Sequence, residues 1–166
     1  FRSDVELLDK GLSRLADLVE REIGIQAREK PGAGAAGGLG YGLTVFCGAS
    51  LETGIDIVLD AVNFEERIED VDLVITGEGK IDGQTAYGKV PIGVARRAKK
   101  YGVPVLVIAG DIGDGIEEIY DAGIDAVMST VNRAMSLEEA MGKSHELLVD
   151  AGERAMRMVR LGFGLC

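Results

Sequence analysis

One run of apolar residues limits the fold of this chain more than any other feature. Residues 103–109 read Val-Pro-Val-Leu-Val-Ile-Ala and contain no charged side chain. Such a run is typical of a strand that is buried on both faces of a parallel sheet. Shorter runs at 73–76 and 126–129 predict two further strands, and helical patterns separate the three. This alternation predicts an α/β fold with a three-stranded parallel sheet and helices on its faces.

Helical periodicity predicts the remaining elements. The expected helices cover residues 4–22, 39–46, 51–61, 64–71, 91–101, 116–121 and 137–160. In the first helix, five apolar residues fall on one face that we expect to be buried: Leu8, Leu12, Leu15, Val19 and Ile23. Ser3 and Ser136 are the expected N-caps of the first and last helices, because each has a glutamate three residues later.

The composition excludes several classes of partner. The formal net charge is -10 and tryptophan is absent, so we expect neither a nucleic acid nor an anionic membrane as partner. No apolar run is long enough to span a bilayer. Cys47 and Cys166 match no metal-binding spacing, which favours reduced thiols in a cytoplasmic protein. A small phosphate-bearing ligand stays compatible with this charge, because backbone amides, lysines or Mg²⁺ can bind it locally.

The polar stretch that follows the 73–76 strand is the main candidate for a binding site. Its side chains that can bind a ligand are Glu78, Lys80, Asp82, Gln84, Thr85 and Lys89. We expect these residues to lie in a loop, and ligands of parallel α/β proteins bind just past the carboxyl ends of the strands. The turn at 110–114 follows the 103–109 strand and should open on the same edge of the sheet.

Two phosphate-loop patterns occur in the sequence, and both are incomplete. Residues 32–37 match G-x-G-x-x-G, but Lys30-Pro31 is a poor strand end, which argues against a Rossmann NAD site. Residues 83–89 match seven positions of G-x-x-x-x-G-K-[ST], but Val90 stands where the Mg²⁺-binding hydroxyl belongs. Lys89 can still meet a phosphate as a point charge.

A glycine-rich segment and an aspartate pair offer weaker candidates. The backbone N–H groups of Gly34, Gly37 and Gly38 can approach an anion before the helix at 39–46. The alternative is that small residues there allow tight packing against a neighbouring element. Asp56 and Asp60 share one helical face; we expect Asp56 to be a solvated charge and Asp60 to be the better ligand.

Four stretches of the chain resemble the type I glycerate kinase family: residues 31–40, 54–60, 72–85 and 88–95. The resemblance implies two α/β domains, one Rossmann-like and built from both chain ends, the other inserted between those ends. Residues 1–50 would belong to or border the inserted domain, and residues 51–166 would form the C-terminal part of the Rossmann-like domain. Since the chain matches only the C-terminal part of such a protein, we expect a fragment that is inactive alone.

The resemblance also implies an activity: ATP- and Mg²⁺-dependent phosphorylation of D-glycerate, with 2-phosphoglycerate favoured over 3-phosphoglycerate as product. The partners would be D-glycerate, ATP and the missing N-terminal part of the same protein, and a homo-oligomer stays open. An alternative from another class is a non-catalytic domain that binds a small molecule without transferring a phosphoryl group.

Residue roles follow as hypotheses from the chemistry of the polar stretch. Asp82 is the first choice for the catalytic base or a Mg²⁺ ligand, and Glu78 is the alternative for both. Lys80 and Lys89 would offset phosphate charge. The remaining expected contacts to substrate or phosphate come from Gln84, Thr85, Gly34, Gly37, Gly38 and Asp60.

Overall fold

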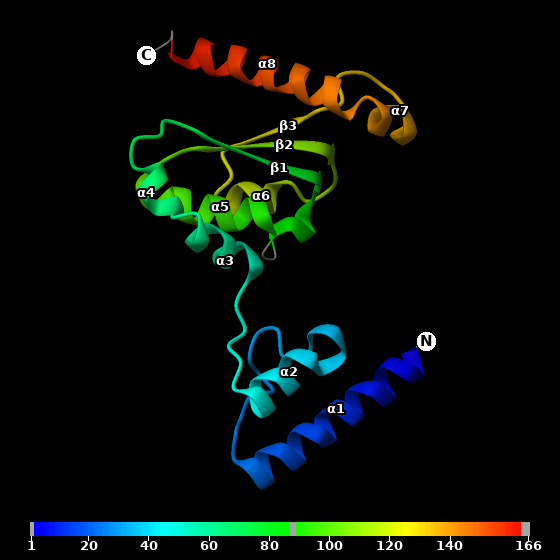
Figure 1. Ribbon diagram of the computed structural model, residues 1–166. Coiled ribbons are helices and arrows are strands. Elements are labelled where there is room, and N and C mark those ends of the chain that lie inside the picture. Colours follow the sequence, from blue (N-terminus) through cyan, green and yellow to red (C-terminus); the bar gives the residue numbers. More distant parts are fainter. Residues whose placement is uncertain (1, 87–88, 164–166) are drawn as a thin grey trace. The chain divides into compact units, whose positions relative to one another are not determined.

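The computed structural model describes residues 2–86 and 89–163 and divides into two compact units, Phe1–Glu52 and Thr53–Cys166 (Figure 1). Each unit has a hydrophobic core of its own. One core cluster lies within residues 16–45, and two others lie within residues 68–155. The predicted domain boundary at 50/51 is two residues from this division. The assignment of the units to an inserted and a Rossmann-like domain stays a prediction.

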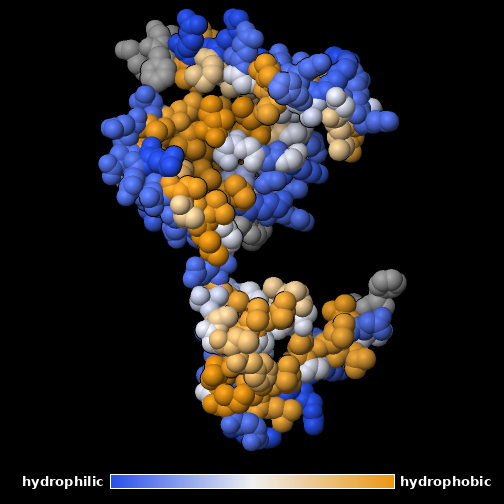
Figure 2. Space-filling view, viewed as in Figure 1, coloured by the Kyte–Doolittle hydropathy of each residue, from blue (hydrophilic) through white to orange (hydrophobic). Residues whose placement is uncertain are grey.

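The first unit consists of helices α1, Arg2–Ile23, and α2, Ala35–Cys47. Its core residues are Ala16, Val19, Ala27, Ala33, Tyr41 and Val45. The predicted buried face of α1 is therefore wrong for four of its five residues, since only Val19 is buried and Leu8 is 69% exposed. Figure 2 shows apolar residues over much of the face of this unit that is in view. Ser3 lies inside α1 and is not its N-cap.

The second unit holds the sheet. Its elements are α3 Gly54–Ala61, α4 Phe64–Ile68, β1 Val74–Ile81, the 3-10 helix η1 Gly83–Ala86, α5 Val90–Ala98, the 3-10 helix η2 Lys99–Tyr101, β2 Val105–Ile112, α6 Glu117–Asp121, β3 Ala126–Ser129, α7 Leu137–Gly142 and α8 Ser144–Phe163. The three strands are parallel, in the order β1-β2-β3, which confirms the predicted α/β class.

Side chains of β2 alternate between the two faces of the sheet, as the pleat of a strand requires. Val105, Val107 and Ala109 pack in a cluster with residues of α4, α5 and α6. Leu106 and Ile108 pack with residues of α8. Figure 1 shows the same three layers, with α8 on one face of the sheet and α3 to α6 on the other.

Two strands extend further than the sequence predicts. β1 continues to Ile81 and β2 to Ile112, and the register pairs Glu78 with Ala109 and Lys80 with Asp111. Glu78 and Lys80 therefore belong to a strand, so their predicted place in a loop is wrong. The backbone ladder continues there because its hydrogen bonds do not depend on side-chain polarity.

The last predicted helix is divided in two. α7 ends at Gly142 and α8 begins at Ser144, where the sequence predicts one helix over 137–160. The predicted cap at Ser136 is confirmed, because its Oγ accepts the N–H of Glu139 at 3.2 Å. Within the described residues, none of the helices combines the length and the apolar character that crossing a membrane demands.

Candidate active site at the carboxyl ends of the strands

The loops that follow β1 and β2 are joined by two backbone hydrogen bonds. Gly83 N donates to Asp114 O at 2.9 Å, and Gly113 N donates to Ile81 O at 2.8 Å. A Cβ at Gly113 would lie 3.0 Å from both Asp82 Cβ and Lys80 Cε. The lack of a side chain at residue 113 therefore lets the two loops meet directly beside Asp82.

An open cavity of about 450 Å³ lies beside the joined loops at this edge of the sheet. Its lining residues are Lys80, Asp82, Gly83, Gln84, Asp114, Gly115 and Glu118. The structure thus brings together three of the predicted site residues, Lys80, Asp82 and Gln84. The turn at 110–114 was expected on this edge, but no sequence signal pointed to Glu118, which comes from the short helix α6.

The charge of the cavity limits what it can bind. Three carboxylates, those of Asp82, Asp114 and Glu118, face one ammonium group, that of Lys80. Lys80 Nζ also lies 3.6 Å from Asp111 Oδ2, so part of its charge is already offset. A bare polyphosphate would be repelled by this lining, and it needs a cation to enter.

The hydroxyl of Thr85 lies at the centre of a small hydrogen-bond group. Its Oγ1 accepts the N–H of Asp82 at 3.1 Å and a hydrogen of Lys89 Nζ at 3.5 Å. The hydroxyl donates to Asp82 Oδ1 at 3.4 Å, and Thr85 N donates to Asp82 O at 2.8 Å. The side chain is fully buried, with a relative exposure of 0%, and does not line the cavity.

Two other predicted residues lie outside the cavity lining. Glu78 is half-buried in β1, and its Oε1 accepts the N–H of Gly79 at 3.2 Å. Lys89 is exposed and directly precedes α5. Their roles as base, metal ligand and phosphate contact stay predictions.

Mg²⁺ is the cation that the sequence resemblance implies, and the residues present match its usual chemistry in part. Across residues 2–86 and 89–163, no three His, Cys, Asp or Glu residues are grouped closely enough to hold a metal. Mg²⁺ commonly needs only one or two protein carboxylates, since waters and phosphate oxygens complete its shell. Asp82, with Asp114 or Glu118, meets that requirement at the cavity. Glu78 is not among the lining residues.

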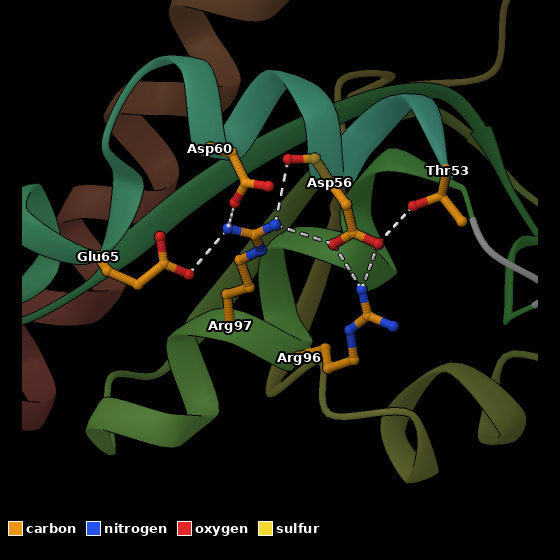
Figure 3. A network of polar contacts seen from close by, with 6 residues as sticks. All are labelled: Thr53, Asp56, Asp60, Glu65, Arg96 and Arg97. Atoms are coloured by element: carbon orange, nitrogen blue, oxygen red, sulfur yellow. Dashed lines mark hydrogen bonds and ion pairs between the residues drawn. The ribbon is translucent and has the colours of Figure 1, made fainter. Parts of the chain in front are cut away.

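Asp60 takes part in an ion-pair network that joins α3 and α4 to α5 (Figure 3). Arg97, whose side chain is only 10% exposed, donates through Nη1 to Asp60 Oδ1 at 2.5 Å and to Glu65 Oε1 at 2.8 Å. Its Nη2 donates to the main-chain oxygen and to Oδ1 of Asp56, both at 3.1 Å. Arg96 Nη2 donates to both carboxylate oxygens of Asp56, at 2.6 and 2.8 Å.

This network corrects the prediction that Asp56 is a solvated charge. The hydrogen bond from Arg96 holds the pKa of Asp56 well below its ordinary value, and bonds from Thr53 and Arg97 add to the effect. The carboxylates raise the pKa of Arg97 in turn, Asp60 most of all. No local pattern pointed to a partner for these aspartates, because Arg97 lies 37 residues beyond Asp60 in the chain.

The glycine-rich segment combines features of both interpretations offered above. Ala36, Gly37 and Gly38 have left-handed backbone angles, which kink the start of α2. Gly34 and Gly38 line a cavity of about 230 Å³ within the first unit. Tight packing also occurs, since a Cβ at Gly40 would lie 2.3 Å from Gly32 O.

The cavity of the first unit carries mixed charge. Asp9, Glu29 and Arg28 line it. The Arg28 guanidinium is already held by Glu20 and Asp17, at 2.9 and 2.6 Å. An anion there would depend on backbone N–H groups, and anion binding by Gly34, Gly37 and Gly38 stays a prediction.

A parallel sheet with a polar cavity at the carboxyl ends of its strands defines an α/β protein of the class that binds small ligands at that edge. The model of the glycerate kinase family matches residues 1–160, so the chain belongs to the glycerate kinase family.

Individual relatives agree with this assignment. The chain is 53% identical over 150 residues to the glycerate kinase of Halalkalibacterium halodurans, covering 90% of this chain and 40% of that protein. It is 44% identical over 155 residues to the glycerate 2-kinase of Escherichia coli, covering 93% and 41%. A crystal structure described as glycerate kinase 2 of Salmonella typhimurium LT2 has a TM-score of 0.71 and 41% identity, covering 99% of this chain and 42% of that one. The chain therefore spans about 40% of the length of the relatives it matches.

Proposed function

We propose that the protein to which this chain belongs is an ATP-dependent kinase of D-glycerate. The observation that carries the proposal is the cavity at the ends of β1 and β2, where Lys80, Asp82 and Gln84 meet in a member of the glycerate kinase family. Phosphoryl transfer requires positioned reactants and offset phosphate charge, and this cavity offers a carboxylate, an amide and an ammonium group for that work. A reaction of this kind belongs in the cytoplasm, which we propose as its location.

In the proposed reaction, a glycerate hydroxyl oxygen forms a bond to the γ-phosphorus of ATP. The bond from that phosphorus to the oxygen bridging to the β-phosphate breaks, and ADP leaves with the electron pair. Asp82 accepts the proton of the hydroxyl, which keeps the balance of atoms and charge. Lys80 offsets charge on the transferred group, and the Gln84 amide hydrogen-bonds the acid.

Mg²⁺, when bound, would neutralise phosphate charge in this acidic cavity, and Asp114 and Glu118 would hold it while Asp82 acts as the base. This cation is the physical requirement that the negative lining imposes on any nucleotide substrate. We propose the 2-hydroxyl as the acceptor, in line with the name of the E. coli relative, glycerate 2-kinase.

A chimeric enzyme tests the proposal. This chain replaces the matching segment of the Halalkalibacterium halodurans glycerate kinase, where 53% of the aligned residues are identical. A matched chimera that carries the E. coli segment controls for the effect of grafting itself. We expect ADP release that depends on D-glycerate, and a phosphorus NMR signal split by a single methine proton, as a 2-phosphate requires.

Other outcomes have definite meanings. A signal split by two methylene protons would move the acceptor to the 3-hydroxyl. Calorimetric binding of ATP without ADP formation, beside an active control chimera, would support the alternative of a non-catalytic binding domain. Loss of both binding and turnover in a folded chimera would overturn the proposal.

A further inference from the structure

We propose that Thr85 is a positioning residue, which orients the Asp82 carboxylate and the Lys89 ammonium group and does not itself contact substrate. The inference rests on the proposed function, since it assigns a role in that same site. It differs from the role expected from the sequence, in which Thr85 hydrogen-bonds the acid substrate.

The hydrogen bonds of the Thr85 hydroxyl support this positioning role. A threonine hydroxyl donates one hydrogen and accepts at two lone pairs. In this structure both lone pairs are used, by Asp82 N–H at 3.1 Å and by Lys89 Nζ at 3.5 Å. The single hydrogen is directed at Asp82 Oδ1, 3.4 Å away. The contact with Asp82 N–H has ordinary hydrogen-bond length, the other two are longer and weaker, and together they surround the hydroxyl with groups of its own turn.

The burial of the Thr85 side chain also supports this role. Thr85 has a relative exposure of 0%, whereas its neighbour Gln84 is exposed and lines the cavity. A ligand in the cavity can therefore reach Gln84 and Asp82 but not the Thr85 side chain. Since a buried hydroxyl without partners is costly, its three hydrogen bonds hold the turn in one geometry.

The opposite side of Asp82 is limited by Gly113. A Cβ at Gly113 would lie 3.0 Å from Asp82 Cβ and from Lys80 Cε, closer than ordinary contact. Gly113 has no left-handed backbone angle, so an alanine there is not strained by the backbone itself. Thr85 and Gly113 thus act on the Asp82 carboxylate from two sides, one by hydrogen bonding and one by leaving space.

The test compares threonine variants of equal shape or equal chemistry in the chimeric enzyme. Thr85→Val keeps the shape and removes every hydrogen bond of the side chain, whereas Thr85→Ser keeps the hydroxyl. We expect Thr85→Val to lower kcat about a hundredfold with little change in KM for D-glycerate, because misplaced catalytic groups slow the chemical step. Thr85→Ser should restore most of kcat. A rise in KM for D-glycerate at unchanged kcat would overturn the inference in favour of direct substrate contact.

Gly113→Ala tests whether the free space at residue 113 is needed to position Asp82, and Gly79→Ala is its matched control. A Cβ at Gly79, one residue before Lys80 in β1, would meet no atom within 4 Å. We expect Gly113→Ala to lower kcat about tenfold and Gly79→Ala to leave it unchanged. Equal activity in the two variants would remove Gly113 from the positioning of Asp82.

An independent measurement separates failure of this inference from failure of the proposed function. Amide hydrogen exchange in the 166-residue chain reports the Asp82 N–H bond without any enzymatic activity. We expect Thr85→Val to speed exchange at Asp82 about tenfold or more, and Thr85→Ser to preserve protection. Unchanged exchange in Thr85→Val would overturn the positioning role even if the chimera is an active kinase. Faster exchange with an inactive wild-type chimera would overturn the proposed function alone.

Discussion

Gly40 and Gly42 of α2 show how differently two residues of one type can be used within three positions. A Cβ at Gly40 would lie 2.3 Å from Gly32 O, inside the distance that any side-chain atom tolerates. A Cβ at Gly42 would meet no atom within 4 Å. The requirement for glycine at residue 40 therefore comes from the returning segment at 32–33, whose Ala33 O also accepts the N–H of Tyr41.

The contrast predicts opposite effects of alanine at these two positions. Gly40→Ala should destabilise the first unit by about 2 kcal/mol, because the backbone at Gly32 must move away from the new methyl group. Gly42→Ala should stabilise α2 by roughly 0.5–1 kcal/mol, because alanine favours helix over glycine. Urea unfolding followed by circular dichroism measures both, and equal midpoints for the two variants would contradict the packing argument.

Asp82 is the proposed base of the reaction, and its replacement should slow turnover. Asp82→Asn in the chimeric enzyme keeps the shape of the side chain but cannot accept the hydroxyl proton. We expect kcat to fall by about two to four orders of magnitude, the usual share of general base catalysis. The circular dichroism spectrum should not change, and turnover equal to that of the unsubstituted chimera would remove Asp82 from the mechanism.

A network of ion pairs joins α5 to α3 and α4 in the second unit. Arg97 is buried and donates hydrogen bonds to carboxylates of both helices. Arg96 contacts Asp56 with a side chain that is 58% exposed. α5 also packs closely on α3 through apolar atoms, since a Cβ at Gly93 would lie 2.6 Å from Ile55 side-chain carbons. The position of α3 on α5 therefore depends on one buried guanidinium and one missing side chain.

Removal of that guanidinium should destabilise the second unit. Arg97→Met keeps the apolar part of the side chain but leaves Asp56, Asp60 and Glu65 facing each other without their common partner. We expect a clearly lower midpoint of thermal unfolding, because Asp60 and Glu65 lose the guanidinium that holds them together, while Asp56 keeps only Arg96 and Thr53. Arg96→Met is the matched comparison, and it should lower the midpoint less than Arg97→Met, because the Arg96 side chain is 58% exposed and solvent screens its ion pair. If the midpoint of Arg97→Met equals that of the wild type, Arg97 adds nothing to the stability of the second unit.

The same network predicts a dependence of stability on pH. The pKa of Asp56 is lowered in the folded chain, chiefly by Arg96 and then by Thr53 and Arg97. An unfolded aspartate titrates near pH 3.9, so the stabilisation is complete above that range and is lost as the pH falls through the folded pKa. The urea midpoints of the wild type and of Asp56→Asn should therefore differ at pH 7, keep that difference down to about pH 4, and come closer between about pH 4 and pH 3, without meeting there because the folded pKa is lower still. A constant difference over this range would contradict the prediction.

The ends of strands and helices are where the structure differs most from what the local sequence pattern predicts. The apolar runs located all three strands, but β1 and β2 continue into polar residues such as Lys80 and Asp111. Their pairing depends on the neighbouring strand and on Gly110, where a Cβ would lie 2.6 Å from Gly79 O. No pattern within a single strand contains that information. The break between α7 and α8 at Lys143 did have local signals, because glycine often ends a helix and serine often begins one, and these residues stand at 142 and 144. The prediction of one helix over 137–160 did not use them.

For the whole molecule, the separate cores predict that residues 53–166 fold without residues 1–52. The two core clusters of the second unit contain no residue before Ile68 and draw on α4, α5, α6, α8 and the sheet. A unit with its own core folds as a domain. We expect a polypeptide of residues 53–166 to unfold in one cooperative thermal transition, within a few degrees of that unit in the full chain. A broad, non-cooperative transition would contradict the division.

The sequence alone determined the fold class, the three strands and the position of the polar stretch at one edge, where three of its six predicted residues, Lys80, Asp82 and Gln84, line the cavity. These follow from apolar runs and from the rule that parallel strands end together, which need only local order. Tertiary structure decided that Glu118 lines the cavity, that Thr85 is buried on Asp82, and that Arg97 pairs with three carboxylates. Those facts depend on contacts between segments far apart in the chain, whose geometry no local pattern encodes.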